Sequence, residues 1–535
     1  MQSRALLTLS LVLALCTDGV VHSANILALM GIVSPSHHIW NGVLLHTLAQ
    51  RGHNLTILSV DLPRAHEKVP PNAHYIHLEK AYDIYKVEDA DTKLDITEYI
   101  GLSPFASIPK FYDFGLKTVQ LIYESQGIQQ LLAYPRDFRF DLIIYDSTLG
   151  GFLLAFAHHF NYPTIAAISA FHNPPATIDF MSNHYFPAYT PYHSTTYSPR
   201  MSFWERFHNT AVFAADTLYR RLYYNPRVEA MVRPHFGGDM PPVTDLAKLT
   251  SIAMVNSHPA IDYVEALPPN VIEIGGMQIQ EPKPLPAELD TFMRGGRKGV
   301  IFFSLGTNMK SGDMSPDRMQ IILQAFGNLT DYNFLWKFDQ EYLRGETLPP
   351  NVLIKPFFPQ RDILAYPKMR AFVTHCGGMS SQEATWRGVP MVGIPLFFDQ
   401  HRNLRQSLLA GCAKKVDYLT MTAKLLASSI KHVAADPQMV ANAKRRSRYF
   451  RDNPLKPLDK AVWWIEYLMR EPNPSHLKSH AAELNFFQAH SLDVLLVWVL
   501  AIILSVMLVG KILISVVQRS DIQMPHHSSR HRKSD

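Results

Sequence analysis

Blocks of apolar residues alternate with stretches of helical spacing along most of the chain, which predicts β-strands alternating with α-helices. Residues 25–30 form the first apolar block, residues 39–50 have helical spacing and end before Gly52, and residues 55–60 form the next block. This order is a β-α-β unit, the building block of a parallel sheet. The same reasoning predicts a helix at 149–160 and further strands at 141–145, 164–169, 251–255 and 271–274.

A proline-rich stretch at 281–286 interrupts the pattern and predicts a stiff linker. Beyond it the alternation restarts, with a helix at 316–326 and strands at 299–305, 333–338, 352–357, 371–374 and 391–396. The sequence therefore predicts the α/β class, with two Rossmann-like β/α/β domains. The cleft between two such domains is where we expect the ligand site.

The N-terminus has the pattern of a cleaved signal peptide. Arg4 precedes an apolar run at 5–16, and the small residues Ser23 and Ala24 follow at a plausible cleavage site. A retained anchor helix is the alternative, but the run is short for a membrane span.

A second apolar run near the C-terminus is long enough to cross a bilayer. It is uncharged at 494–510 and continues, after Lys511, to residue 517. A buried core helix is a poor alternative because the run has no polar face. Basic residues follow it, so the positive-inside rule predicts a short cytosolic tail and a lumenal body. Arg532 and Lys533 resemble a variant di-basic retrieval signal, which indicates the endoplasmic reticulum membrane.

Composition narrows the protein class. The 535 residues are enough for two or three domains, and 47% hydrophobic with 18% charged residues excludes global disorder. The net charge of +5 is small and partly C-terminal, so we expect no nucleic-acid partner. Only Cys376 and Cys412 would remain in the mature chain, too few for a disulfide framework or a zinc set. Of two glycosylation sequons, Asn328 is the better candidate, because Asn54 lies in a predicted strand.

The stretch 170–224 is dense in Tyr, Phe, His and Pro and has weak periodicity. It predicts either a helical insertion or a set of loops. An extra packing layer and an apolar wall for an acceptor molecule are both open.

The block 371–390 runs from a strand through a glycine turn into a helix. A helix N-terminus at the carboxyl end of a parallel strand offers free N–H groups and partial positive charge, which suits a diphosphate. His375 and Ser380 are placed to bind phosphate oxygens, and Gly377 lets the backbone approach closely. Alternatively, Ser380 and Glu383 form a capping box that only caps the helix.

The same block resembles the signature of the UDP-glycosyltransferase family, which here covers residues 372–403. Further stretches are similar to family landmarks: Phe-Ser-Leu-Gly-Thr at 303–307, Phe-Phe-Pro-Gln at 357–360, Ala-Val-Trp-Trp-Ile-Glu at 461–466 and Phe-Phe-Gln-Ala-His-Ser-Leu-Asp at 486–493. The match extends over most of the chain and is closest to the invertebrate membrane-bound members. It implies the GT-B glycosyltransferase fold, a UDP-sugar co-substrate and no other cofactor.

The resemblance also implies roles for individual residues of the UDP-sugar site. Uracil would stack on Phe357 and be read by Gln360, and Glu383 would hold the ribose. Contacts to the diphosphate and the sugar are implied for Ser304, Gly306, Thr307, His375, Gly377, Ser380, Asp399 and Gln400. The chain departs from the pattern where Phe357 replaces Trp, Met379 replaces Asn and Cys376 replaces Gly.

Two histidines, His37 and His38, follow the first strand, in what the pattern predicts to be a loop. Either has the chemistry of a general base. The family register selects His37 and implies Asp146, at the end of the strand predicted at 141–145, as the carboxylate that orients it. The implied reaction is inverting attack by an acceptor hydroxyl, without a covalent sugar–enzyme intermediate.

We expect no metal, because the Asp89-x-Asp91 string lies in a charged stretch typical of a solvated loop. The donor sugar is predicted to be glucose, although Arg402, close to Asp399 and Gln400, leaves glucuronate open. The acceptor is predicted to be a small lipophilic phenol, alcohol or steroid. The rival hypotheses are a membrane-anchored UDP-sugar-binding protein without catalysis and a lipid-modifying glycosyltransferase. A homo-oligomer is possible.

These expectations divide the chain into seven parts. They are a signal peptide at 1–23, an N-terminal acceptor-binding domain at 24–280, a linker at 281–298, a C-terminal UDP-sugar-binding domain at 299–455, helices returning to the N-terminal domain and a pre-membrane segment at 456–492, a transmembrane helix at 493–517 and a cytosolic tail at 518–535.

Overall fold

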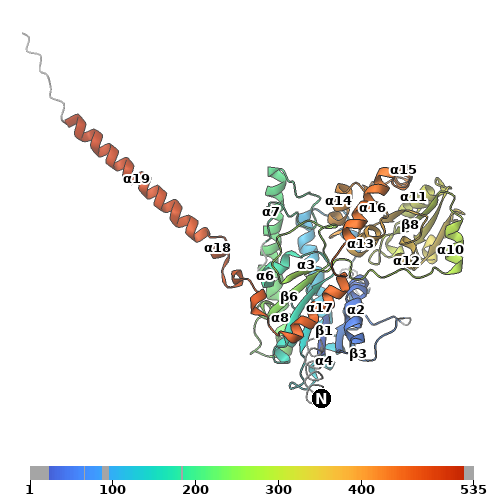
Figure 1. The fold of residues 1–535 in the computed structure, drawn as a ribbon, viewed down its shortest axis with the longest axis horizontal. Coiled ribbons are helices and arrows are strands. Elements are labelled where there is room, and N and C mark those ends of the chain that lie inside the picture. The colour runs from blue at the N-terminus through green and yellow to red at the C-terminus, as the bar shows by residue number, and fades with distance from the viewer. Residues whose placement is uncertain (1–22, 65–66, 87–94, 182–184, 523–535) are drawn as a thin grey trace, which may run out of the picture. The chain divides into compact units, whose positions relative to one another are not determined.

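Two parallel β-sheets form the centre of the protein in a computed structural model (Figure 1). The structure describes residues 23–64, 67–86, 95–181 and 185–522. The predicted signal peptide up to residue 22, the Asp89-x-Asp91 string and the tail from residue 523 lie outside the described residues. The chain folds as two compact units, residues 1–478 and 479–535.

The N-terminal sheet has the strand order β3-β2-β1-β4-β5-β6-β7, and its strand pairs are parallel. Its strands are β1 (Asn25–Met30), β2 (Asn54–Ser59), β3 (Ala73–His77), β4 (Leu142–Asp146), β5 (Thr164–Ser169), β6 (Thr250–Val255) and β7 (Val271–Glu273). The helices of this half include α2 (Pro35–Gln50), α3 (Pro104–Tyr123), α4 (Gln126–Leu132), α5 (Ala155–His159), α7 (Phe203–Tyr219), α8 (Asn225–Phe236) and α9 (Val243–Lys248), with short turns η2 (Ala81–Tyr85) and η3 (Ile96–Tyr99).

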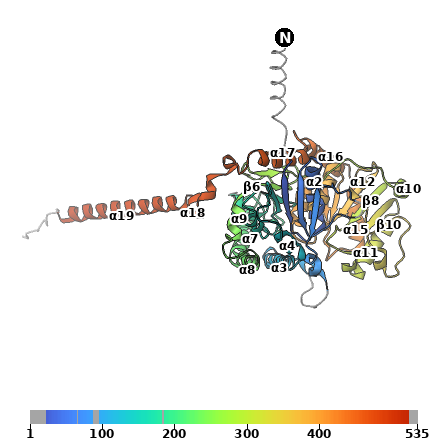
Figure 2. The same cartoon turned by 90° about the horizontal axis from the view of Figure 1, so that it is seen from below.

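Helices cover both faces of this sheet, which explains its nearly continuous apolar strands. Along β1, Leu27 and Leu29 pack into the core shared with α3, α7 and α8. The alternate residues Ile26 and Ala28 pack into the core shared with α2 and α17 (Pro457–Arg470). Figure 2 shows these two helix layers on opposite sides of the sheet. The late helix α17 therefore returns to the N-terminal half, where Arg51 also pairs with its Glu466.

The C-terminal sheet repeats this architecture with the strand order β10-β9-β8-β11-β12-β13. Its strands are β8 (Gly299–Ser304), β9 (Tyr332–Lys337), β10 (Val352–Lys355), β11 (Met369–Thr374), β12 (Met391–Gly393) and β13 (Ala413–Lys415). Its helices are α10 (Ala287–Arg294), α11 (Pro316–Gly327), α12 (Gln360–Leu364), α13 (Gly378–Arg387), α14 (Gln400–Leu409), α15 (Ala423–Ala435) and α16 (Pro437–Arg451), with turns η6 (Ser311–Asp313) and η7 (Gln340–Leu343). Ile301 and Phe303 face one core and Val300 and Phe302 the other.

The aromatic-rich stretch contains both loops and helices. Its first part holds only the short helices η4 (Pro175–Thr177) and α6 (Ile178–Met181). Its second part is α7, which continues through the π-helical turn η5 (Arg220–Tyr224) into α8. Both predicted alternatives, loops and a helical insertion, are thus correct for different halves of the stretch.

The structure corrects the helix predicted at 149–160. Only α5 (Ala155–His159) is α-helical there, because the chain first makes turns at Gly150 and Gly151. Gly150 has φ = 84°, a left-handed conformation that ends regular helix and favours glycine. Two edge strands, β3 and β13, were not predicted.

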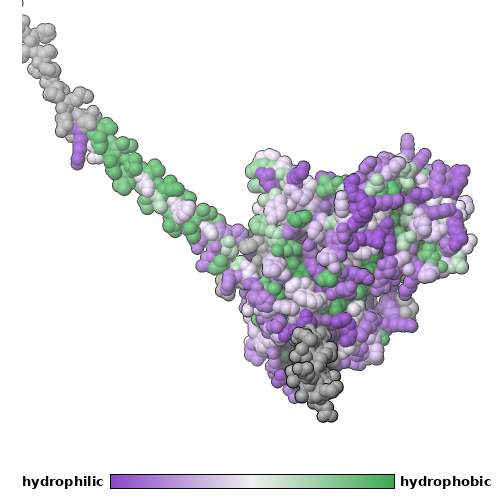
Figure 3. Space-filling view, viewed as in Figure 1, coloured by the Kyte–Doolittle hydropathy of each residue, from purple (hydrophilic) through white to green (hydrophobic). Residues whose placement is uncertain are grey.

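The second unit contains the short elements η9 (His480–Glu483), α18 (Phe486–Ala489) and the long helix α19 (Leu492–Ile522), and η8 (Ser475–Leu477) precedes it in the first unit. Residues 492–519 of α19 are long and apolar enough to cross a membrane. Figure 3 shows this helix as a continuous apolar surface. These properties fit a membrane anchor.

Candidate active site

A histidine and an aspartate meet at the carboxyl end of the N-terminal sheet. His37 Nδ1 lies 3.0 Å from Asp146 Oδ2, and the two residues are 5% and 4% exposed. Asp146 ends β4, which pairs directly with β1. His37 lies in the first turn of α2 and not in a loop as predicted, because Pro35 at the first helical position starts the helix four residues early.

Two further groups hold the carboxylate of Asp146. Asn41 Nδ2, one turn after His37, donates to Oδ2 at 3.1 Å, and the Thr148 N–H donates to Oδ1 at 3.0 Å. Burial alone would raise the pKa of Asp146. The charge of His37 and its hydrogen bond outweigh burial and, with the Thr148 bonds, lower that pKa. Sequence reasoning missed Asn41, because it placed His37 in a loop and so gave no helical spacing between the two residues.

The neighbouring His38 faces a different environment. Its Nδ1 lies 3.4 Å from Ser59 Oγ, and burial lowers its pKa despite the nearby carboxylate of Asp61. Of the two predicted candidates, only His37 contacts Asp146 among the described residues.

Helix α13 begins at a glycine turn at the carboxyl end of β11. Gly377 is the N-cap residue, and no side chain caps the helix. The alternative of a capping box is therefore wrong: Ser380 and Glu383 lie inside the helix. Instead, Gln360 Nε2 donates to Ser380 Oγ at 3.1 Å and to Glu383 Oε2 at 2.9 Å. The first N–H groups of the helix have no intrahelical partner and are available to an anion.

His375 packs between Gly377 of this turn and Gly306 of the loop that follows β8. A Cβ atom at Gly306 would lie 2.5 Å from its ring, and one at Gly377 would lie 2.4 Å from it. Burial, followed by the positive charge of Lys337, lowers the pKa of His375 to about 4, so the ring is neutral at pH 7. Lys337, which was not predicted, ends β9 and donates to the Gly306 carbonyl at 2.5 Å. It brings a cation to the turn.

The turn also contains a strained residue. Cys376 is buried and has φ = 63°, a left-handed conformation that disfavours residues with a Cβ atom. This is the position at which the family commonly has glycine. Burial raises the pKa of its thiol, so the group is neutral.

The residues predicted to hold the nucleoside lie at the open side of the turn. The Phe357 ring is 58% exposed, and the guanidinium of Arg64 lies 5.7 Å from its centroid. Of the residues predicted to contact the diphosphate, Thr307 is also exposed, whereas Ser304 is buried and its Oγ accepts the Gly306 N–H at 3.3 Å.

Asp399 and Gln400 lie at the start of α14. Gln400 Oε1 accepts the N–H groups of Leu396 and Phe397, which leaves its Nε2 as the group able to donate to a ligand. Burial raises the pKa of Asp399 to about 6, although a hydrogen bond from Asn403 Nδ2 and the charge of His37 oppose it. The influence of His37 shows that residues of the two halves approach each other here.

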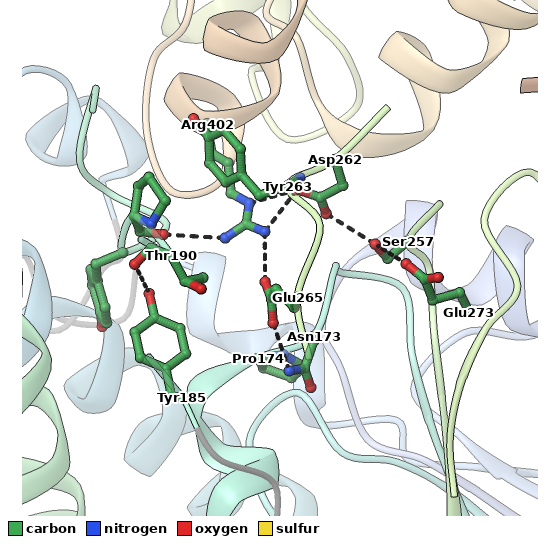
Figure 4. Close-up of polar contacts among 12 residues, drawn as sticks. Asn173, Pro174, Tyr185, Thr190, Ser257, Asp262, Tyr263, Glu265, Glu273 and Arg402 are labelled. Atoms are coloured by element: carbon green, nitrogen blue, oxygen red, sulfur yellow. Dashed lines mark hydrogen bonds and ion pairs between the residues drawn. The ribbon is translucent and has the colours of Figure 1, made fainter. Parts of the chain in front are cut away.

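Arg402, in the first turn of α14, is buried and fully engaged (Figure 4). Its Nη2 lies 2.7 Å from Asp262 and 3.0 Å from Glu265, and its Nη1 donates to the Pro191 carbonyl at 3.2 Å. These partners belong to the N-terminal half, so Arg402 joins the halves.

Gln382 of α13 is a second joint between the halves. Its Oε1 accepts the Gly276 N–H and Gln278 Nε2, both at 3.1 Å. Its Nε2 donates to the carbonyl and the side-chain oxygen of Asn256, at 3.1 and 2.8 Å. Helix α13 is thereby fixed to the N-terminal half.

A cavity with about 710 Å³ of empty space lies beside the histidine–aspartate pair. It is bordered by Asp399 and by Phe171, whose ring contacts that of His37 edge-on at 5.0 Å between centroids. The aromatic-rich stretch supplies much of its wall, including His172, Pro174, Pro175, Tyr192, His193 and Tyr224. Its lining is largely apolar and aromatic, with a few polar side chains, as is typical of a site for a small organic molecule. Among the described residues, no group of three or more His, Cys, Asp or Glu side chains is arranged to hold a metal ion.

Comparisons with known proteins agree with this arrangement. A family model described as UDP-glucoronosyl and UDP-glucosyl transferase matches residues 29–523. UDP-glucosyltransferase 2 of Dactylopius coccus is 34% identical over 485 residues, 89% of each chain. UDP-glucuronosyltransferase 2B7 of Homo sapiens is 30% identical over 476 residues, which cover 86% of this chain and 87% of the relative.

Solved structures show the same fold at low sequence identity. CalG4, the calicheamicin glycosyltransferase, superposes with a TM-score of 0.54 at 18% identity and covers 85% of this chain and 100% of its own. The glycosyltransferase of kitacinnamycin gives a TM-score of 0.53 at 21% identity, covering 83% and 99%. The chain therefore has the GT-B fold and belongs to the family of UDP-glucuronosyl and UDP-glucosyl transferases.

Proposed function

We propose that this protein is an inverting, metal-independent UDP-glycosyltransferase that transfers glucose from UDP-glucose to a hydroxyl of a small lipophilic acceptor. The buried His37–Asp146 contact carries the proposal, because it lies beside a cavity that also reaches Asp399 at the donor site. A UDP-sugar-binding protein without catalysis would have no use for a buried imidazole–carboxylate pair at this place.

The geometry supports His37 as the general base. Asp146 engages Nδ1, which leaves Nε2 to take the proton of an acceptor hydroxyl in the cavity. The low pKa of Asp146 keeps it ionised, and an ionised partner stabilises the imidazolium that forms.

The leaving UDP would be held by the C-terminal half. Its diphosphate would meet the free N–H groups at the start of α13, the hydroxyl of Ser380 and the cation of Lys337. Phe357 would stack on uracil, and Asp399 and Gln400 would bind sugar hydroxyls. Attack on the anomeric carbon from the side opposite UDP inverts its configuration.

The surroundings of Arg402 favour glucose over glucuronate. A glucuronate carboxylate needs a free cation, but Arg402 already pairs with Asp262 and Glu265. The carboxylate of Asp399 would in addition repel a second carboxylate at the sugar. The similarity to an insect UDP-glucosyltransferase points the same way.

We further propose that the enzyme is a single-pass protein of the endoplasmic reticulum membrane, with its body in the lumen and a short basic tail in the cytosol. Helix α19 provides the span. Asn328, exposed at the end of α11, is the preferred glycosylation site. The parts predicted at 24–280 and 299–455 would bind acceptor and donor respectively.

A donor panel tests the proposal. The full chain, reconstituted in lipid nanodiscs, is given 2-naphthol and either UDP-glucose, UDP-glucuronate, UDP-galactose or UDP-N-acetylglucosamine, and UDP release is measured. We expect the fastest release with UDP-glucose and a β-glucoside by NMR. Preferred use of UDP-glucuronate would overturn the donor, an α-glucoside would overturn inversion, and no release with any donor would overturn catalysis.

A further inference from the structure

Two histidines that the proposed mechanism does not use lie together in the wall of the cavity. The ring centroids of His172 and His193 are 6.3 Å apart, and the Tyr192 ring lies 4.2 Å from that of His193. Both histidines border the same cavity as Phe171, whose ring contacts that of His37. They therefore line the space that an acceptor would occupy.

The ion-pair cluster around Arg402, shown in Figure 4, contacts a residue close in sequence to each histidine. Asn173, the residue after His172, donates to Glu265 at 3.0 Å. Pro191, two residues before His193, accepts from Arg402. One buried ion-pair cluster therefore contacts the chain segments that carry both histidines.

Both imidazoles are neutral and have unused hydrogen-bonding capacity. Burial, and then the positive charge of Arg402, lowers the pKa of His172 well below its ordinary value. Burial also lowers the pKa of His193 to about 4. His172 is 8% exposed and His193 is half-buried, and among the described residues no hydrogen bond joins either ring to protein. A neutral imidazole has one N–H donor and one acceptor nitrogen, and both are open to a ligand in the cavity.

The charged groups around the cavity are balanced except for one carboxylate. Arg220 pairs with Asp216 at 2.8 Å and with Asp179 at 2.9 Å, and Arg402 is paired as described. Asp399 has an amide partner but no cation within ion-pair distance among the described residues. A ligand carboxylate would thus find no free cation here and would be repelled by Asp399.

The rest of the wall is apolar and largely aromatic. It comprises Phe111, Leu149, Phe171, Pro174, Pro175, Ala176 and Phe398. Such a wall fits a flat, uncharged ring system, with the histidine pair as its polar contact.

We propose that His172 and His193 form an acceptor-recognition site that binds a neutral oxygen, a carbonyl or a hydroxyl, on an aromatic acceptor. This oxygen is distinct from the hydroxyl that is glycosylated. The inference rests on the proposed function, because it concerns the acceptor of that reaction. It narrows the acceptors from lipophilic hydroxyl compounds in general to uncharged aromatic ones with a second oxygen.

A matched series of acceptors tests the inference on the unaltered enzyme. The series is 2-naphthol, 6-hydroxy-2-naphthamide and 6-hydroxy-2-naphthoate, which share the reacting hydroxyl and differ at the far end. We expect kcat/KM with UDP-glucose to be about tenfold higher for the amide than for 2-naphthol, because the amide oxygen pairs with the two imidazoles. The carboxylate should be at least about tenfold poorer than the amide.

Variants then assign the effect to the two rings. His193→Phe and the double variant His172→Phe/His193→Phe keep ring size but remove the nitrogens, and His432→Phe on the exposed face of α15 is the matched control. The ratio of kcat/KM for the amide to kcat/KM for 2-naphthol should fall to about one in the double variant and stay high in the control. Thermal unfolding and UDP affinity verify that each variant is folded.

The outcomes separate this inference from the proposed function. Turnover of 2-naphthol with UDP-glucose establishes the reaction regardless of the series. If the amide has no advantage, if the carboxylate is preferred, or if the advantage survives in the double variant, the recognition site is wrong although the transferase activity stands.

Discussion

The two halves of the active site differ in how complete they are without substrate. In the N-terminal half, His37 and Asp146 are almost fully buried, and both carboxylate oxygens already accept hydrogen bonds. In the C-terminal half, Phe357 is mostly exposed and α13 begins without a side-chain cap. The proposed base is thus preorganised, whereas the proposed donor site leaves its aromatic face and its N–H groups for the ligand to cover.

This difference predicts which kinetic constant each half controls. Changes at the preorganised pair should lower kcat and leave UDP affinity unaltered. Changes at the open donor site should weaken UDP affinity and leave kcat at saturating donor unaltered. Four experiments test the contrast, beginning with the largest effect.

Replacing the base should have the largest effect. We expect His37→Ala to lower kcat by about 10²–10⁴-fold, because it removes the imidazole that Asp146 orients toward the acceptor proton. UDP affinity, measured by calorimetry, should stay within about twofold. The matched control is His38→Ala, since His38 contacts Ser59 and not Asp146. Equal losses in both variants would contradict the assignment.

Changing the partner of the base should have the next largest effect. Asp146→Asn keeps the shape but removes the charge that orients His37, so we expect kcat to fall by about 10²-fold. Asn41→Leu removes only one of the donors to Asp146 and should cost about tenfold. Initial rates at saturating donor measure both. A larger loss from Asn41→Leu than from Asp146→Asn would show that the amide, not the carboxylate, orients the ring.

On the donor side, Phe357→Ala should weaken UDP binding about tenfold, because it removes the surface on which uracil would stack. At saturating UDP-glucose, kcat should be unchanged. Phe357→Trp enlarges the aromatic face and should tighten UDP. If Phe357→Ala lowered kcat without changing affinity, the contrast between the two halves would fail.

The smallest effect concerns pH. Because burial raises the pKa of Asp399 to about 6, its carboxyl gains a proton as the pH falls through that value. The neutral carboxyl accepts sugar hydroxyls more weakly, so UDP-glucose affinity should fall about threefold between pH 7.5 and pH 5. The measurement uses the His37→Ala background, which excludes titration of the base. Asp399→Asn should remove this pH dependence of UDP-glucose affinity. If the pH dependence persists in that variant, another group causes it.

The central strands of both sheets were predictable because they are apolar throughout. Strand β5 was predicted to the residue, and β1 likewise, since both faces of these strands are covered. The edge strands β3 and β13 were missed. Their sequences, Ala-His-Tyr-Ile-His and Ala-Lys-Lys, are short and partly polar, as is common for edge strands. These segments become strands only because they pair with a neighbouring strand in the folded chain.

The active-site residues divide in the same way. The glycine turn and His375 could be placed from a local motif, and His37 and Asp146 from the family register. The residues that contact them from distant parts of the sequence could not be predicted. Lys337 and Arg402 act on groups far away in the sequence, and no local pattern connects Arg402 with Asp262. Long-range contacts of this kind depend on the folded chain and become visible only there.

The joint at Gln382 has a practical consequence for handling the protein. Its four bonds to Gly276, Gln278 and Asn256 involve no ionised group. Bulk electrolyte screens charges and leaves neutral amide contacts nearly untouched. High-salt washes used to strip peripheral proteins from membranes should accordingly leave the contact between the two halves intact. Urea competes for amide groups, so it should weaken this contact.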